Sequence, residues 1–198
     1  MGTGRSTSAK DFTVVVELTG LKANTEYQYS VQLDCIPDHR DLFATSTLAK
    51  KGSAVEFDVA FGGGAGYVPQ HEYMWTTIGR ANPDVLMLLG DNVYSDAPEI
   101  PEMQHYCYYR RQSRPEFREL VSKVAVYTIW DDHDFGTNDC QGGPKIKAPD
   151  WKVPVWNVFR NNWVNPSYGG GAKQPGVWYD YYIGDVHFIM TDGRIYRD

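Results

Sequence analysis

The sequence predicts an α/β domain preceded by a small β-rich region. Three apolar runs of strand length, Val55–Phe61, Val85–Leu89 and Val124–Trp130, alternate with segments that carry a helical pattern. The second and third runs end abruptly in acidic side chains. The first fifty residues show only strand-like and turn-like patterns. We therefore expect the α/β part to begin after them.

The β-rich region is predicted to contain three short strands. Phe12–Leu18 is apolar and β-branched, and Tyr27–Leu33 alternates with a period of two. The polar corner Thr19–Glu26 between them has turn chemistry. A third strand is expected at Asp41–Leu48.

The spacing of tyrosines in this region resembles the last strands of a fibronectin type III or immunoglobulin-like sandwich, in which a corner tyrosine bonds back to the upstream backbone. The residues that carry this pattern are Leu21, Thr25, Tyr27, Tyr29 and Val31. Such a sandwich needs about seven strands, so we expect an incomplete domain at residues 1–50, joined by a polar linker to a second domain at residues 51–198. The alternative is a β-hairpin arm on the main domain.

The second domain opens with a β-loop-α-β unit. The strand Val55–Phe61 runs into the glycine-rich Gly62–Gly66. A helix is predicted at Gln70–Arg80, and Asn82–Asp84 stops it before the strand Val85–Leu89. The glycine-rich loop fits neither the P-loop nor the dinucleotide-binding spacing. It could cradle a phosphate with backbone N–H groups, but we favour a tight active-site turn.

The remaining elements are assigned by apolar spacing and by turn residues. They are an irregular aromatic stretch from Asp91 to Tyr109, a helix at Arg114–Ser122, a strand at Val124–Trp130, a loop at Thr137–Pro149, a helix at Trp151–Asn162 broken near Pro154, and strands at Val177–Ile183 and His187–Thr191. Gly184-Asp185 is a good hairpin turn between the last two strands.

Composition and charge exclude several classes of protein. The 198 residues are 42% hydrophobic, which allows a substantial core. The net charge of −6 without a Lys/Arg block gives no footprint for duplex nucleic acid. No apolar stretch approaches the roughly 18 residues that span a bilayer, and the polar start shows no signal peptide. Cys35, Cys107 and Cys140 include no C-x-x-C pair, which leaves one disulfide open.

Acidic and metal-capable side chains follow two of the predicted strands. Asp91 comes after five apolar residues and Gly90, which lets the backbone turn tightly, and Tyr94 lies three residues on. The run Asp131–Asp134, Asp-Asp-His-Asp, follows Trp130. Open α/β sheets bind ligands beyond the carboxyl ends of their strands, so we expect the two motifs to meet. Neighbouring ionisable groups would repel one another unless a cation or substrate gathers them. The pattern therefore indicates a hydrolase metal site.

Each motif also has a structural interpretation. Asp91 could cap a turn, and Asp131–Asp134 could be a solvated acidic turn. Asn138 and Asp139 add oxygen donors in the same loop. Carboxylate and amide oxygens suit calcium, magnesium, manganese or ferric iron, whereas the imidazole of His133 also suits zinc and iron.

Together the motifs resemble the PhoD-like alkaline phosphatases of the calcineurin-like metallophosphoesterase superfamily. The matching segments are Gly90-Asp91-x-x-Tyr94, Asp131-Asp132-His133-Asp134 with Asn138-Asp139, and Thr191-Asp192-x-Arg194-x-Tyr196-Arg197. The resemblance implies a metallophosphoesterase-type α/β sandwich from Val55 onward, after a domain like the family's N-terminal immunoglobulin-like one. It implies an extracellular or periplasmic phosphatase or phosphodiesterase that acts on phosphate esters through a multinuclear metal centre of iron and calcium, or alternatively manganese or zinc.

The resemblance also implies roles for individual residues. Asp91 would bridge metals, Tyr94 would ligate the iron, and Asn138 would ligate a neighbouring ion. Asp132 and His133 align with an asparagine-histidine pair of the wider superfamily. The first member of that pair is a ligand, and the second helps to protonate the leaving group.

Arg194 would hold substrate oxygens bidentately, with a structural salt bridge as the alternative.

Two features depart from the family pattern. Gly64 stands where the family has a cysteine ligand, and Gly184–His187 imitates a late Gly-Asp-x-His motif but precedes Asp192. We interpret Gly184–His187 as structural. We therefore expect a fragment of a longer enzyme, or alternatively a catalytically degenerate binding or structural module. The sequence indicates neither the substrate nor the oligomeric state.

Overall fold

The computed structural model describes residues 1–34 and 36–198, excluding the side chains of residues 36–41. Its centre is a parallel sheet with the strand order β3-β4-β5, formed by Val59–Gly62, Val85–Leu89 and Ala125–Ile129. This is the mixed α/β fold that the alternation of strands and helices predicts. Within the described part of the chain, no helix has both the length and the apolar character needed to cross a membrane.

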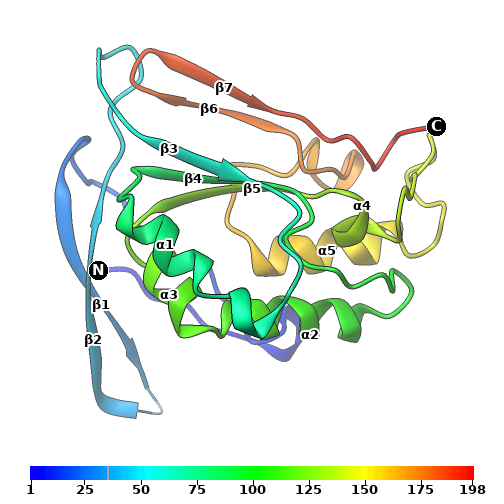
Figure 1. Cartoon of the computed structure of the whole chain (residues 1–198), viewed down its shortest axis with the longest axis horizontal. Coiled ribbons are helices and arrows are strands. Elements are labelled where there is room, and N and C mark those ends of the chain that lie inside the picture. Colours follow the sequence, from blue (N-terminus) through cyan, green and yellow to red (C-terminus); the bar gives the residue numbers. More distant parts are fainter. Residues whose placement is uncertain (35) are drawn as a thin grey trace.

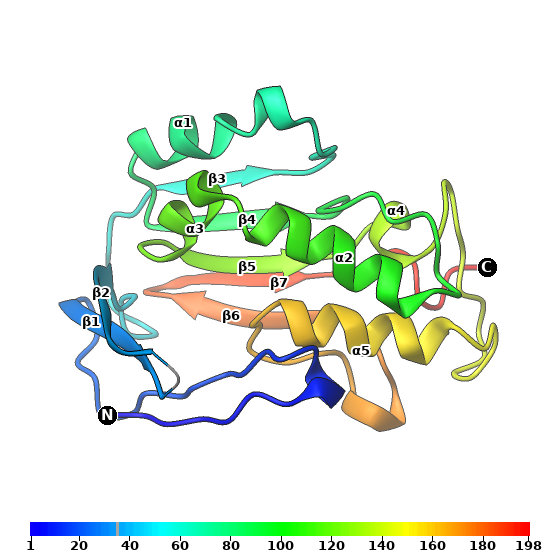
Figure 2. The same cartoon turned by 90° about the horizontal axis from the view of Figure 1, so that it is seen from below.

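Elements pack on both faces of this sheet and give three layers (Figures 1 and 2). Helices α1 (Met74–Arg80), α2 (Pro101–Gln112), α3 (Pro115–Val121) and α5 (Lys152–Asn162) lie on one face. The antiparallel hairpin of β6 (Tyr179–Ile183) and β7 (Val186–Met190) lies on the other. The short α4 (Asp132–Phe135) follows β5, and single turns of 3₁₀-helix form at Ser8–Lys10, Pro69–His71 and Gly171–Lys173.

The central strand β4 shows why the sequence here is a continuous apolar run. Leu86 and Leu88 belong to the core beneath the helices, whereas Val85 and Met87 belong to the core beneath the β6–β7 hairpin. All four side chains are at most 7% exposed. Because side chains alternate along a strand, a strand covered on both faces is apolar throughout. Each buried side chain of this size contributes about 1.5–3 kcal/mol.

The β-rich region forms a hairpin of β1 (Glu26–Leu33) and β2 (Ile36–Ser46). The backbone N–H of Lys22 donates to the hydroxyl of Tyr27 (2.8 Å), a contact of the corner-tyrosine kind. The hydroxyl of Tyr29 donates to the carbonyl of Ser122 (2.8 Å) and so fastens the hairpin to the α/β domain. The predicted immunoglobulin-like domain is not confirmed, because these two strands are the only ones among the described residues before residue 50.

Three predictions about single elements are wrong. Phe12–Leu18 forms no strand, and Val15 in it is 62% exposed, because no strand among the described residues pairs with it. Helix α2 occupies much of the stretch predicted to be irregular. Its buried face includes the polar Gln104 and Arg111, which obscures the apolar period. Helix α5 is unbroken, since Pro154 lies in its first turn, where the backbone N–H has no partner within the helix.

The other predicted helices and strands are present, with ends that differ by a few residues. The strand expected at Asp41–Leu48 is the second half of β2. Cys107 and Cys140 are free, and Cys35 lies outside the described residues.

Candidate metal centre

Strands β4 and β5 end side by side, and the loops that follow them carry the candidate site. Leu89 pairs with Ile129 at the end of the ladder, so the two strands point toward the same edge of the sheet, beside α4 (Figure 2). Gly90 has a φ of 108°, and a Cβ there would lie 2.5 Å from the Cβ of Asp131. Glycine is therefore required for the two loops to approach this closely.

Asp91, Asp132 and His133 form the candidate metal cluster. Each offers one ligand atom, and these atoms all lie within 4.8 Å of one another. Asp91 follows β4, while Asp132 and His133 lie in α4, whose first turn is closed by a capping box between Asp131 and Asp134. The structure thus brings together two of the predicted ligands and the predicted general acid, which can itself bind a metal.

Asp91 is the half-buried centre of this cluster. Its Oδ1 accepts a hydrogen bond from the backbone N–H of His133 (3.3 Å), and its Oδ2 accepts one from the hydroxyl of Tyr94 (3.2 Å). Burial raises the pKa of Asp91, and the charges of Asp132 and Asp131 raise it further. A bound cation would relieve this repulsion. The phenol of Tyr94 therefore lies beside Asp91 in the structure.

Asp132 is 7% exposed and is held by two donors. The backbone N–H of Asp139 donates to its Oδ2 (2.6 Å), and Nη2 of Arg194 donates to its Oδ1 (3.3 Å). Burial acts to raise the pKa of Asp132, but these donors bring it below its ordinary value. Asn138 is exposed, and its amide donates to the carboxylate of Asp139 (2.9 Å). The structure therefore does not bring the side chain of Asn138 into the cluster.

Arg194 reaches the same place from the turn after β7. Its Nε forms an ion pair with Asp131 and its Nη2 forms one with Asp132. The carboxylate of Asp192 accepts hydrogen bonds from the backbone N–H groups of Arg194 (2.9 Å) and Ile195 (3.0 Å), which fixes the turn. The Arg194 side chain is 11% exposed, and its buried Nη1 has no hydrogen-bond partner within the described part of the chain. Arg194 therefore forms the salt bridges that were the alternative interpretation, and its Nη1 is a donor without a partner among the described residues.

Two acidic residues, Asp96 and Asp134, make contacts in the site that the sequence alone does not predict. Asp96 Oδ1 lies 2.5 Å from Nδ1 of His133. Burial acts to lower the pKa of His133, but Asp96 raises it above its ordinary value. Asp134 is 2% exposed and joins the two motif loops, since it accepts hydrogen bonds from the backbone of Asn92, Val93 and Asp131. The only feature of the sequence that could have indicated a site role for Asp96 is its acidic side chain, five positions after Asp91.

The glycine-rich loop packs against the end of β4. The N–H of Gly64 donates to the carbonyl of Gly90 (3.2 Å), and the N–H of Ala65 donates to that of Asp91 (3.0 Å). These amides hold the Asp91 loop, which fits the tight-turn interpretation better than a phosphate cradle. A Cβ at Gly64 would lie 3.9 Å from the hydroxyl of Tyr94. Position 64 thus lies beside Tyr94 without supplying a side chain.

The Gly184–His187 segment lies away from the cluster. Gly184 packs against Ser53 and Val55, near the start of β3 and thus at the opposite edge of the sheet. His187 pairs with Asp180 (2.8 Å) on the exposed surface of the β6–β7 hairpin. This placement agrees with the structural interpretation.

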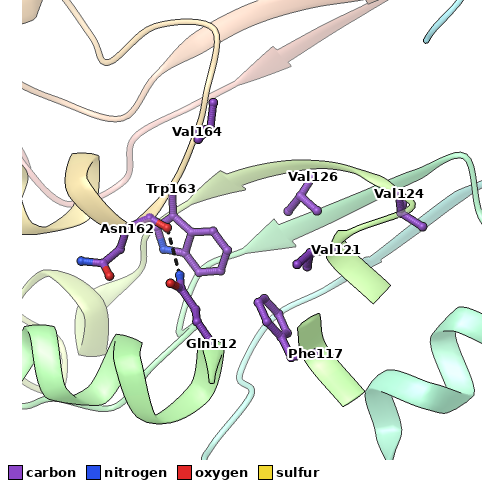
Figure 3. A pocket seen from close by; sticks show the side chains of 8 residues that line it. All are labelled: Gln112, Phe117, Val121, Val124, Val126, Asn162, Trp163 and Val164. Carbon is purple, nitrogen blue, oxygen red and sulfur yellow. Dashed lines mark hydrogen bonds between the residues drawn. The ribbon is translucent and has the colours of Figure 1, made fainter. Parts of the chain in front are cut away.

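Two of the hollows among the described residues adjoin the core beneath the helices. An open groove of about 500 Å³ is lined by Gln112, Phe117, Val121, Val124, Val126, Asn162, Trp163 and Val164 (Figure 3). It lies beside the first half of β5, whereas the candidate metal cluster follows the other end of that strand. A smaller cavity of about 220 Å³ lies beneath the glycine-rich loop and is lined mainly by apolar side chains of the sheet, α1 and α3. Neither hollow includes Asp91, Asp132 or His133 in its lining.

Comparisons with known proteins identify the fold. Neither a protein-family model nor a curated protein matches the chain. A solved structure described as "Structure of PhoD" matches 90% of this chain with a TM-score of 0.75 and 17% sequence identity. The chain spans 39% of the length of that PhoD chain. At this identity the likeness establishes architecture, and the protein therefore has a PhoD-like fold.

Proposed function

We propose that this chain is a metal-dependent phosphoester hydrolase of the alkaline phosphatase or phosphodiesterase type. The observation that carries the proposal is the convergence of Asp91, Asp132 and His133 beyond the ends of two parallel strands, in a chain with a PhoD-like fold. Ligands of open α/β sheets bind at such an edge. An extracellular or periplasmic place of action rests on the family resemblance alone.

The donor set fits a metal ion. Two carboxylates and an imidazole suit manganese, zinc or iron, and the phenol of Tyr94 adds a ligand that suits ferric iron. Calcium prefers oxygen ligands, so it would depend on the carboxylates, with Asn138 joining only after its amide leaves Asp139. When bound, the metal would polarise a phosphoryl oxygen and lower the pKa of water. We assign Asp91, Tyr94 and Asp132 as its ligands.

The other site residues act on the substrate in this proposal. His133 serves as the general acid that gives a proton to the leaving oxygen, a role that contributes about 10²–10⁴-fold. The neighbouring Asp96, by raising the pKa of His133, favours the protonated form that this role requires. Arg194 keeps its ion pairs and offers its unpaired Nη1 to a phosphoryl oxygen.

Hydrolysis of an aryl phosphate tests the proposal. We expect removal of metal by a chelator to abolish turnover and added manganese, zinc or iron to restore it. Asp91→Ala should lower kcat/KM by more than about 100-fold, since changes outside the ligand shell of metal sites already cost about 10–100-fold. Asp185→Ala, in the exposed turn of the β6–β7 hairpin, is the matched control and should keep full activity. Undiminished hydrolysis by both the chelated protein and the Asp91→Ala variant would sink the idea.

A second candidate function is a binding or structural module with a degenerate centre. Two observations favour it: Gly64 supplies no side chain beside Tyr94, and the guanidinium of Arg194 already forms ion pairs with Asp131 and Asp132. Elemental analysis after expression with abundant metals separates the two functions. A purified chain that holds no iron, calcium, manganese or zinc supports the module, whereas a stoichiometric metal supports the hydrolase.

A further inference from the structure

Asp96 and His133 form a close pair at the rim of the candidate metal cluster. Oδ1 of Asp96 lies 2.5 Å from Nδ1 of His133, and the two side chains are 46% and 17% exposed. Asp96 comes from the loop after β4, whereas His133 lies in α4 after β5. The pair therefore spans the same two strand ends that build the cluster.

The surrounding contacts hold the imidazole in place. The backbone N–H of His133 donates to Asp91 (3.3 Å), and its carbonyl accepts hydrogen bonds from the N–H (3.4 Å) and hydroxyl (3.2 Å) of Ser95. The ring of Tyr94 lies against the imidazole, with 4.2 Å between ring centroids. Asp96 itself has a φ of 48°, in the left-handed region that aspartate tolerates better than most residues. The imidazole is thus held through the backbone of His133, through the Tyr94 ring against one face, and through Asp96 at Nδ1.

We propose that Asp96 is a positioning residue that holds His133 in the tautomer protonated at Nδ1, so that Nε2 is the nitrogen left for the chemistry of the site. A carboxylate accepts a hydrogen bond and cannot donate one when ionised, so the proton of the pair belongs to Nδ1. The hydrogen bond made by one ring nitrogen decides what the other can do. Carboxylates that play this part beside metal-site histidines fix both tautomer and ring orientation.

The inference extends to both roles open to His133. As a metal ligand, His133 needs an unprotonated nitrogen, and the Nδ1–H tautomer leaves Nε2 in that state. As the general acid, it needs one nitrogen to keep its proton while the other gives a proton away. Asp96 satisfies both requirements through one contact. The effect on hydrolysis rests on the proposed function, whereas the tautomer itself does not.

Three variants test the inference. Asp96→Asn keeps an oxygen acceptor for Nδ1–H but removes the charge. Asp96→Gly removes the acceptor and suits the positive φ, so it avoids the backbone strain that an alanine would add. The matched control is Asp180→Gly on the β6–β7 hairpin. Asp180 pairs with His187 at 2.8 Å, and that histidine also stacks on a tyrosine ring, Tyr182.

The primary readout is the pair of ¹⁵N shifts of the His133 ring in metal-free protein, assigned with His133→Gln and recorded at about pH 9, where a histidine is neutral. We expect the Nδ1–H tautomer in the native chain and in Asp96→Asn, and a mixture of tautomers in Asp96→Gly. Where His133 ligates the metal, manganese affinity should fall about 10–100-fold in Asp96→Gly and much less in Asp96→Asn; where it acts only as the general acid, manganese affinity should stay the same and the tautomer alone should change. Asp180→Gly should leave both measurements unchanged.

The outcomes separate this inference from the proposed function. Unaltered His133 shifts in Asp96→Gly would overturn the role of Asp96, whatever the activity of the chain. An altered tautomer in a chain that hydrolyses no phosphate ester would support Asp96 and reject the hydrolase. In an active chain, Asp96→Gly should also lower kcat more for a phosphate ester with a poor leaving group than for 4-nitrophenyl phosphate, because only the first depends strongly on a general acid.

Discussion

The buried carboxylate of Asp134 fastens the two loops that carry the candidate metal cluster. It accepts hydrogen bonds from the backbone N–H groups of Asn92, Val93 and Asp131, each at 3.1 Å. The hydroxyl of Tyr108, from α2, donates to it as well (3.3 Å). Burial nevertheless raises the pKa of Asp134 from 3.8 to about 7. A single side chain thus couples the geometry of the cluster to pH.

This coupling predicts how stability depends on pH. Between about pH 4 and pH 7 the folded chain holds a proton on Asp134 that the unfolded chain has released, so this residue makes the free energy of unfolding fall as pH rises. The contribution is fully present below the unfolded pKa and is lost as pH passes the folded one. As the pH is raised from about 5 to about 8, the native chain should lose more of its free energy of unfolding than Asp134→Asn does. The difference between the two losses should be on the order of 2 kcal/mol.

Urea unfolding of the metal-free protein at the two pH values measures the effect. The variant loses acceptor capacity and should be less stable overall, so the comparison is between the two slopes with pH and not between absolute stabilities. Asp185→Asn, in an exposed turn, should reproduce the native slope. Identical slopes for the native chain and Asp134→Asn would show that Asp134 is ionised in the folded state throughout this range.

At the scale of elements, the site depends on how closely the ends of β4 and β5 approach. Gly90 has a φ of 108°, and a Cβ added there would meet the Cβ of Asp131 at 2.5 Å and its backbone nitrogen at 2.6 Å. Backbone cannot move aside as a side-chain tip can. The glycine is therefore part of the geometry that places Asp91 beside α4.

Gly90→Ala should separate the two loops. We expect a loss of about 1–3 kcal/mol from overpacking, with a further cost from the positive φ, and a metal affinity that falls in parallel. Gly62→Ala is the control, because Gly62 has no such φ and a Cβ there would meet no atom within 4 Å. Urea unfolding and manganese titration check both variants. Equal stability of the two would contradict a close approach of the loops.

The sequence predicts well the elements whose side chains are apolar because they are buried. It predicts less well the elements that depend on an ion pair or a hydrogen-bonded strand from a distant part of the chain. Strand β4 is recognisable because both of its faces are buried. Helix α2 is not, because its buried Arg111 pairs with the equally buried Glu72 (3.1 Å), a contact visible only in three dimensions. Phe12–Leu18 has strand composition but has no partner strand within residues 1–34 and 36–198.

The same division holds for the candidate site. Asp91, Asp132 and His133 could be placed together in advance, because strand ends of an α/β sheet converge. Asp96 could not, since its contact with His133 depends on how the loop after β4 folds back. Asn138 follows the motif in sequence, yet its amide is turned to Asp139. Residues on strand ends are predictable, whereas residues on loops need the structure.

At the scale of the whole molecule, the β6–β7 hairpin connects the second core to the site. Tyr181 of β6 stacks between Tyr127 of β5 and Phe188 of β7, with ring centroids 3.7 and 5.0 Å away. The chain leaves β7 into the turn where Asp192 also accepts a hydrogen bond from the indole of Trp130 (2.9 Å). Arg194 is presented to the cluster by this turn. The β6–β7 hairpin, which covers the face of the sheet opposite the helices, therefore helps to fix the position of Arg194.

Substitutions at Tyr181 test this dependence. The side chain is 7% exposed, and its hydroxyl has no hydrogen-bond partner within the described part of the chain. Tyr181→Ala should cost about 3–5 kcal/mol, as expected for a large aromatic side chain in a core, and should weaken the ion pairs of Arg194. Tyr181→Phe should be neutral or stabilising, because it removes an unsatisfied polar group and keeps the ring.

Ile189, 69% exposed on β7, provides the control, and Ile189→Ala should change stability by less than about 0.5 kcal/mol. Urea unfolding orders the three variants, and, under the hydrolase function proposed above, cleavage of an aryl phosphate by folded protein reports on Arg194. If the hairpin only covers the sheet, folded Tyr181→Ala will keep the native KM and kcat. If it positions Arg194, KM will rise in Tyr181→Ala and stay unchanged in Tyr181→Phe, because the phenyl ring alone keeps the hairpin, the turn at Asp192 and the guanidinium in register.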